Sequence, residues 1–515
     1  MQLTVDALCE RAKKGFAARD MNRKLFEDCY EFLLPYKNSF NRQGVNSGQT
    51  TMNRPNRQFD STAQHASANF VNTMQSNFTP VFTRWATLKA GPGIPETERA
   101  SLNKELETIT DIIFTYLNAS NFATASAEMY FEWGIGTGAL WLFEGDEEQP
   151  LNFMASPIAE MGLIEGKFGT IDGRFREHRI KARLLQATWP NDKVSIDTEL
   201  ADKIRNAPDE EVTVIEACYY DNADFVWRYE VIYEATKHRL LAKKFNEEIC
   251  FTPRWMKVPG NAFGVGPFLL AMADIKTLNQ MKNYMLTNAA LSVFGVYTVE
   301  TKGGFNPNTA NIQPNRFIPV ESNSSPTIRP LERSGSFDIQ EFLMRDLQDS
   351  IRKSMLDDRL PEQQATPATA FEIAQRIKEF QQDIGAAYGR AMLEFVQPLF
   401  KRVVSILNRR GLLPLPDGFQ IDNFFVQVQV VSPIAQTQAI EDVQKFMQAY
   451  EMTASINPQL AQTAYDLEKL PSWLTENTGA PARLLRDEID QEELRQQIIQ
   501  TVAQAQLQEQ QTNDG

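Results

Sequence analysis

Residues able to carry out chemistry are scattered along this sequence. The chain has 515 residues, and its histidines and cysteines are His65, His178, His238, Cys9, Cys29, Cys218 and Cys250. No two cysteines form a CxxC pair, whereas a zinc site needs closely spaced thiolate or imidazole ligands. No short spacing singles out a pair of carboxylates for acid–base work. We therefore predict no catalytic residue, no metal site and no cofactor, and we expect free, mostly buried thiols.

The glycine-rich stretch 134-GIGTG-138 resembles part of a dinucleotide-binding loop. Such a loop follows a strand and opens a helix, whereas this one follows a predicted helix and enters a predicted strand, 139–145. We interpret it as a turn where two backbone segments pack closely. The chain also lacks a GxxxxGK[ST] phosphate loop and a GxSxG nucleophile elbow. An ATP-driven motor is therefore disfavoured.

The composition is that of a folded protein, and the net charge argues against one that binds nucleic acid through a basic face. With 42% hydrophobic and 23% charged residues the chain has the mix of a globular protein, and its length predicts two or more domains or one elaborated domain. A net charge of −14 argues against a basic nucleic-acid-binding face but allows nucleic acid to slide past. No apolar run reaches the roughly 18 residues that span a bilayer, and the start lacks a signal-peptide core, so we expect cytoplasmic synthesis.

The first half of the chain predicts helices followed by strands. Amphipathic helices are expected over 1–35, 59–80 and 97–132, with an extended stretch at 84–90. Alternating or continuous apolar stretches between turn residues make 150–258 rich in predicted strands. We expect a small β-barrel or sandwich there, within an α+β protein that is mainly helical.

Two long amphipathic helices flank an excursion, 293–335, that is rich in Gly, Pro, Asn and Ser. The apolar face of the first helix, 267–292, comprises Met272, Ile275, Leu278, Met281 and Met285. The apolar side of the second helix, 336–358, comprises Ile339, Phe342, Leu343, Leu347 and Ile351. The excursion contains short predicted strands such as 316–320.

A polar loop, 359–367, leads into the longest predicted helix, and the capping box 369-TAFE-372 marks its start. Its apolar stripe includes Leu399 and Val403, and Gly411 and Pro414 are expected to end it. The residues that predict a bend in this helix are Gly385, Gly389 and Pro398. The last expected elements are a strand over 419–431 and an acidic helical region over 433–515. Helices with one apolar face need a partner to bury it, and a closed ring of identical chains offers many. The pattern therefore indicates a structural assembly protein.

This order of elements resembles the head-to-tail connector, or portal, proteins of short-tailed, podovirus-like bacteriophages. The resemblance covers most of the chain and fades after about residue 432. Its motifs are 59-FDSTAQHASANFVNTMQSNFTPVFTRWATL-88, 129-MYFEWGIGTGALWLFEG-145, 264-GVGPFLLAMADIKTLNQMKN-283 and 366-TPATAFEIAQRIKEFQQDIGAAYGRAMLEFVQPLFKRVVSILNRRGLLP-414. The last is the most specific, with its threonine-alanine start, central glycine, glutamate before proline and closing leucine-proline.

The resemblance implies a division of the chain into the parts of a portal subunit. These are a wing (1–265, including the β-rich 150–258, and 368–432), two stem helices (266–292 and 336–358), a clip (293–335), a tunnel loop (359–367) and a helical crown (433–515). It also implies a closed ring, a dodecamer in the particle and possibly thirteen-fold when free, at one capsid vertex of the virion. Double-stranded DNA would pass through the channel during packaging and ejection.

Partners and contact residues follow from the same resemblance. The implied partners are the terminase, tail adaptor and nozzle proteins, and the major capsid, scaffolding and internal core proteins. The implied DNA-channel and tunnel-loop residues are Arg352, Lys353, Arg359, Gln363, Gln364 and Thr366, and the implied clip contacts are Arg316, Arg329 and Arg333.

Alternatives remain open at this point. Arg352 and Lys353 either make weak, exchangeable contacts with DNA or pair with Asp349 and Asp357 of neighbouring subunits. The protein could instead be a tail adaptor or minor capsid ring, an enzyme with an unrecognised site in 150–258, or a helical scaffold unrelated to phages. Adaptors are usually shorter and lack two stem helices around a clip.

Overall fold

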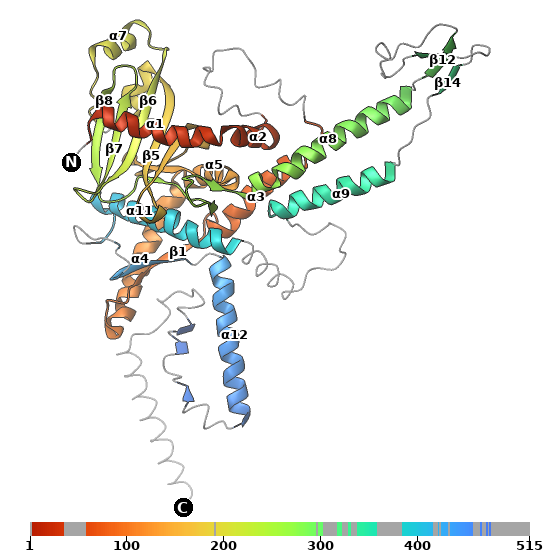
Figure 1. Cartoon of the computed structure of the whole chain (residues 1–515). Coiled ribbons are helices and arrows are strands. Elements are labelled where there is room, and N and C mark those ends of the chain that lie inside the picture. Colours follow the sequence, from red (N-terminus) through yellow and green to blue (C-terminus); the bar gives the residue numbers. More distant parts are fainter. Residues whose placement is uncertain are drawn as a thin grey trace, which may run out of the picture.

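The computed structural model describes residues 3–35, 58–189, 192–294, 297–301, 317–321, 328–330, 337–357, 384–415, 421, 424–430, 433–456, 464–465, 470–471 and 473–474. The body combines helices with antiparallel sheet. Two helical projections extend from it, the pair α8 and α9 on one side and α12 on another (Figure 1). The mixed, mainly helical α+β class predicted from the sequence is confirmed.

Five helices form the first part of the body: α1 (Val5–Met21), α2 (Arg23–Leu33), α3 (Thr62–Phe78), α4 (Glu96–Ala119) and α5 (Phe122–Ile135). Two predicted helices are thus each divided in two. Asn121 explains one break, because its side chain donates to Phe153 O at 2.7 Å and accepts from Phe153 N at 2.8 Å. The amide thereby ties the start of α5 to a strand instead of leaving a continuous helix.

The β-rich region is an open sheet. Its strands β4 (Met161–Glu165), β5 (Ile171–Lys181), β6 (Glu211–Asp221), β7 (Val226–Tyr233) and β8 (His238–Phe245) pair antiparallel in sequence order. The predicted β-barrel is wrong for the described residues, because β4 and β8 are edge strands and do not pair. Helix α1 covers one face, where Gly15 meets Gly162 closely and Leu8 and Ala12 are buried.

Short elements link this sheet to the helices. Helices α6 (Leu185–Thr188) and α7 (Thr198–Asn206) lie between β5 and β6. One small sheet consists of β3 (Leu151–Ala155), β2 (Leu140–Glu144) and β9 (Cys250–Phe251). Strands β10 (Met256–Lys257) and β11 (Gly264–Val265) form a second sheet. Strands β1 (Ala86–Ala90) and β15 (Val426–Val430) form another. The last pair joins segments far apart in the sequence.

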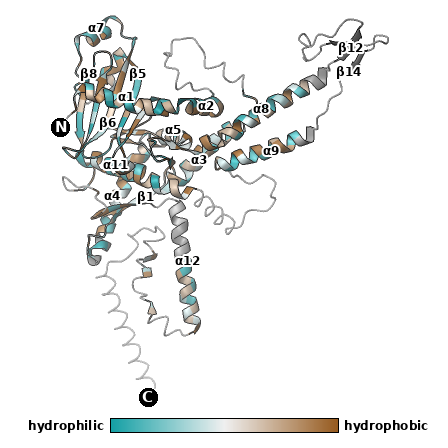
Figure 2. Cartoon of the chain, viewed as in Figure 1, coloured by the Kyte–Doolittle hydropathy of each residue, from teal (hydrophilic) through white to brown (hydrophobic). Residues whose placement is uncertain are grey.

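Beyond the body, α8 (Pro267–Phe294) and α9 (Phe337–Ser354) run side by side. Strands β12 (Tyr297–Thr301), β13 (Phe317–Glu321) and β14 (Ile328–Pro330) form a sheet at their far end (Figure 1). Strand β12 pairs with β13 in parallel and with β14 antiparallel. Hydrophobic and hydrophilic residues alternate along both helices (Figure 2).

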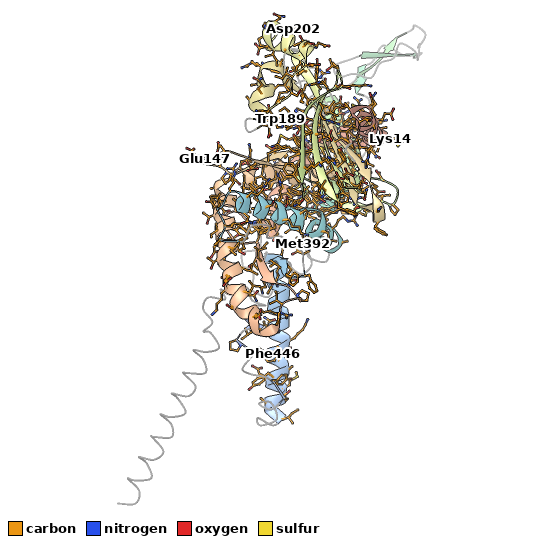
Figure 3. The ribbon with its side chains drawn as sticks, turned by 90° about the vertical axis from the view of Figure 1, so that its left-hand side faces the viewer. Lys14, Glu147, Trp189, Asp202, Met392 and Phe446 are labelled. Atoms are coloured by element: carbon orange, nitrogen blue, oxygen red, sulfur yellow. The ribbon has the colours of Figure 1, made fainter. Side chains whose placement is uncertain are left out.

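The predicted long helix is described from residue 384. It is helical over 384–391, passes through a π-turn at Met392–Val396 and continues as α11 (Gln397–Arg409). Gly411, with φ +67°, ends it as predicted. Helix α12 (Pro433–Ile456) then leaves the body, and Asp202 on α7 and Phe446 on α12 lie toward opposite ends of the molecule (Figure 3).

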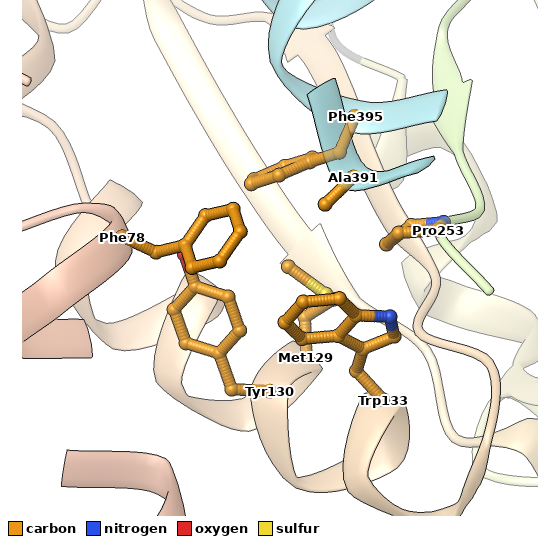
Figure 4. Close-up of a pocket in the computed structure, with 7 residues that line it drawn as sticks. All are labelled: Phe78, Met129, Tyr130, Trp133, Pro253, Ala391 and Phe395. Carbon is orange, nitrogen blue, oxygen red and sulfur yellow. The ribbon is translucent and has the colours of Figure 1, made fainter. Parts of the chain in front are cut away.

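An aromatic core joins the long helix to the body. Phe78, Met129, Tyr130, Trp133, Pro253, Ala391 and Phe395 converge on one another (Figure 4). The rings of Trp133 and Trp255 lie 4.8 Å apart, and the hydroxyls of Thr79 and Tyr130 share a buried hydrogen bond of 2.7 Å. This packing predicts that the region moves as one unit.

Candidate functional site: the stem pair and its root

Helices α8 and α9 bury a narrow shared seam. The predicted face of α8 is confirmed, with Met272, Ile275 and Leu278 at 5%, 4% and 1% exposure. On α9, only part of the predicted side is buried. Ile351 is fully buried, whereas Phe342 is 70% exposed and the seam uses Met344 and Met355 instead. Helices α8 and α3 together cover a narrower stripe of α9 than the apolar pattern suggested.

Polar contacts fix how the two helices lie. Ser350 Oγ donates to Asp274 Oδ2 at 2.8 Å across the pair. Asn279 Oδ1 accepts from Phe59 N at 2.7 Å, which ties α8 to the residues before α3. Among the described residues, these contacts hold the inner half of the pair to the body.

The cations predicted at the channel lie at the inner end of α9. Arg352 pairs with Asp349 of its own chain at 3.5 Å, and both side chains are more than half exposed. Such a pair contributes about 0–1 kcal/mol, so it holds Arg352 only weakly. Lys353 is exposed and makes no ion pair with any other residue that the structure describes. The two predicted cations thus share one end of one helix.

Helix α9 stops at a defined place. Leu356 has φ +57°, and Asp357 N donates to Arg352 O at 2.8 Å, which is the geometry of a Schellman stop. The Asp357 carboxylate accepts from Asn69 Nδ2 at 2.9 and 3.0 Å. The alternative role of Asp357 as a partner for a neighbouring cation therefore competes with a contact inside the chain.

Most of the other predicted contact residues lie outside the part of the chain that the structure describes. Arg359, Gln363, Gln364 and Thr366 of the predicted tunnel loop and Arg316 and Arg333 of the predicted clip lie outside the described residues, as does the capping box. Arg329 is placed on β14. The predictions for these residues stay predictions.

The root of α8 is built from two crossing backbone segments. A Cβ on Gly136 would lie 2.1 Å from Gly264 O, and a Cβ on Gly266 would lie 2.1 Å from Gly134 O. Gly266 N donates to Ile135 O at 2.9 Å across the same crossing. Because only glycine permits this approach, the interpretation of 134–138 as a closely packed turn is confirmed.

Arg254 forms a second junction beside this root. Its side chain is 2% exposed, and its guanidinium contacts Glu394 of the π-turn at 2.5 Å and Gly169 O at 2.9 Å. No motif or periodicity singled out Arg254. Glu394 was visible only as the glutamate before proline in the fourth motif.

The remaining candidate chemical groups lie in the body. All four cysteines are free and buried. His178 Nδ1 lies 3.4 Å from Glu216 Oε1, and burial lowers the pKa of this imidazole below its usual value. Within the part of the chain that the structure describes, no group of three His, Cys, Asp or Glu side chains could hold a metal ion, and no helix is long and apolar enough to span a membrane.

Comparison with known proteins identifies the family that this chain matches. Residues 5–485 match the family model described as bacteriophage head to tail connecting protein. A probable portal protein of Bordetella phage BPP-1 is 23% identical over 458 residues, which cover 84% of this chain and 80% of that relative.

Two solved structures of gene transfer agent (GTA) particles also align. A chain of the virion of the native particle aligns with a TM-score of 0.32 and 13% identity over 79% of this chain and 93% of that chain. A chain of the neck of an empty particle aligns with a TM-score of 0.32 and 10% identity over 74% and 88%. Because the family model spans nearly the whole sequence, the chain belongs to the bacteriophage head to tail connecting proteins, the structural portal proteins of phage particles.

Proposed function

We propose that this chain forms a closed ring at the portal vertex, with double-stranded DNA passing through its channel during packaging and ejection. Helices α8 and α9 act as the stem, β12 to β14 as the clip, the body as the wing and α12 as the start of the crown. The clip side meets the terminase first and the tail adaptor and nozzle proteins later. The observation that carries this proposal is the outer face of α8.

The outer face of α8 carries an uncharged stripe. Leu270 and Tyr284 are 61% and 58% exposed. The members of the stripe are Leu270, Ala273, Thr277, Gln280 and Tyr284, all of them exposed and separated by alternating steps of three and four residues. This is the spacing with which one helix packs along another at a shallow angle. We infer that a second copy of the chain covers the stripe.

The outer face of α9 has the opposite character. It carries Asp346, Asp349 and Lys353, all exposed, and the exposed Phe342 lies at its outer end. Arg345 and Glu341 also pair there, 2.6 Å apart and four residues apart. Charged groups of both signs keep their hydration when they face water, so this face suits the channel and not a subunit contact. Mixed charge also avoids the tight phosphate binding that would stop DNA from sliding.

The oligomeric state tests the ring directly. Native mass spectrometry of the purified protein is expected to give about twelve copies, or thirteen when free, of a 58.5 kDa chain. Negative-stain images of the same sample should show a central hole wide enough for duplex DNA. A monomer or dimer that persists after scaffolding and capsid proteins are added would contradict the proposal.

Neutralising the cations at the inner end of α9 tests the channel role. We expect two variants to shorten the packaged DNA or weaken its retention. One combines Arg352→Gln with Lys353→Gln, and the other adds Arg359→Gln. The reason is that Lys353 has no carboxylate partner among the described residues and Arg352 only an exposed one.

The control removes two charges elsewhere. Lys13→Gln with Lys14→Gln changes two exposed lysines on α1, and particles carrying it should package as the parent does. Unchanged packaged length and unchanged salt-dependent retention in the α9 variants would show that these cations serve only pairing within the ring.

A further inference from the structure

The long helix contains a π-turn just before a proline that a regular α-helix would not accommodate. Residues 384–391 and α11 are helical on either side of the five-residue turn Met392–Val396. Pro398 lies two residues after the turn and cannot donate to Glu394 O, with which its ring would clash in a regular α-helix. The wider π-turn accommodates the proline. Such turns often mark functional positions.

Glu394, inside the π-turn, reaches out of the helix to Arg254. Its carboxylate accepts from Arg254 N at 2.9 Å, from Nε at 3.2 and 3.3 Å, and from Nη2 at 2.5 Å. Both carboxylate oxygens and both kinds of Arg254 donor, backbone and guanidinium, are therefore used. Charge-assisted contacts of this bidentate kind fix orientation more strictly than a single hydrogen bond.

Arg254 also contacts two other segments of the proposed wing, the glycine crossing and the β4–β5 turn. It forms an isolated β-bridge with Thr137, and the next residue, Trp255, donates to Gly136 O at 2.9 Å. Its Nη2 donates to Gly169 O at 2.9 Å in the β4–β5 turn, and Nη1 lies 3.4 Å from Glu165 Oε1. Arg254 thus joins the π-turn, which its guanidinium and backbone N–H contact, to the glycine crossing from which α8 starts, which its backbone contacts.

We propose that the Arg254–Glu394 contact is a positioning clasp, which sets the direction in which helix 384–391 enters the wing and couples it to the root of α8. The described residues on either side of 358–383 are each tied to the body by a side-chain contact. One tie is Asp357 on Asn69, and the other is the clasp. The consequence for DNA handling rests on the proposed portal function, whereas the positioning itself does not.

A second buried arginine on the same helix provides the matched comparison. Arg402 of α11 is also 2% exposed, and its Nη1 lies 3.5 Å from Glu247 Oε2. It stacks on the Phe245 ring at 4.2 Å and touches neither the π-turn nor the α8 root in any contact described. Removing the charge of Glu247 therefore disturbs a buried arginine without opening the clasp.

Hydrogen exchange measures the positioning directly. In Glu394→Gln, amide exchange over 384–396 and 264–270 is expected to rise together, on the order of tenfold or more, because both segments lose the same tie. In Glu247→Gln, exchange over 384–391 should stay close to that of the parent. Equal changes in the two variants, or none in Glu394→Gln, would overturn the proposal.

Two further variants keep the test decisive. If Glu394→Gln does not fold, Glu394→Asp and Arg254→Lys retain the charges with shorter or single-point contacts, and each should raise exchange in the same two segments to a smaller degree. Exchange that rises in only one segment would overturn the coupling.

DNA retention provides the functional readout. Rings of Glu394→Gln with the parent mass are expected to release DNA at lower salt than Glu247→Gln rings, and equal release would overturn the link to DNA handling. If the parent forms no ring, the proposed function fails, and the exchange data still decide whether the clasp exists.

Discussion

Gly136→Ala is expected to destabilise the folded chain by about 3 kcal/mol or more, one of the largest effects of a single methyl group in this protein. The added Cβ would lie 2.1 Å from Gly264 O, a backbone atom that cannot move without moving the start of α8. Gly266→Ala should act equally, because its Cβ would meet Gly134 O at the same distance. Urea unfolding followed by far-UV circular dichroism measures the loss.

Gly389→Ala is the matched control. This glycine lies in the helix before the π-turn, and no atom lies within 4 Å of the position of an added Cβ. Alanine there should be neutral or stabilise the helix by up to about 1 kcal/mol. If Gly136→Ala unfolds at the same urea concentration as Gly389→Ala, the crossing is not closely packed in solution.

Tyr284→Asp is expected to dissociate the proposed ring into monomers or small oligomers. Tyr284 belongs to the uncharged stripe of α8, so a subunit contact there would bury an unpaired carboxylate at a cost of about 3 kcal/mol or more. In the proposed ring this contact would recur at every interface, so the losses would accumulate. Native mass spectrometry over a range of protein concentrations measures the shift.

Folding and assembly can be separated in this experiment. Because Tyr284 is 58% exposed in the single chain, the variant should keep the parent's circular dichroism and melting behaviour as a monomer. Phe225→Asp is the control, since Phe225 is 74% exposed in the β6–β7 turn, away from the stem pair. An intact ring in Tyr284→Asp, or equal loss in Phe225→Asp, would show that the α8 stripe is not the subunit contact.

The positions of most helices and strands could be predicted from the sequence. The α8 face, the end of the long helix at Gly411 and its burial through Leu399 and Val403 agree with the periodicity of apolar residues. Periodicity works here because it depends on neighbours within one or two turns. The periodicity overestimated the width of the buried face on α9, because apolar spacing does not indicate how wide a surface the packing partners cover.

The family and its structural role were also predictable, because the quoted motifs keep their order along the chain and the family model matches residues 5–485. No periodicity, however, indicates which distant segments meet. That Gly136 meets Gly264, that Arg254 meets Glu394 and that the sheet stays open were decided by tertiary packing. Each depends on residues far apart in the chain, whose approach follows from how the helices bury their apolar faces together. The sequence alone determined most of the elements and the family, and the tertiary structure decided the junctions that hold α8 and α9 to the body.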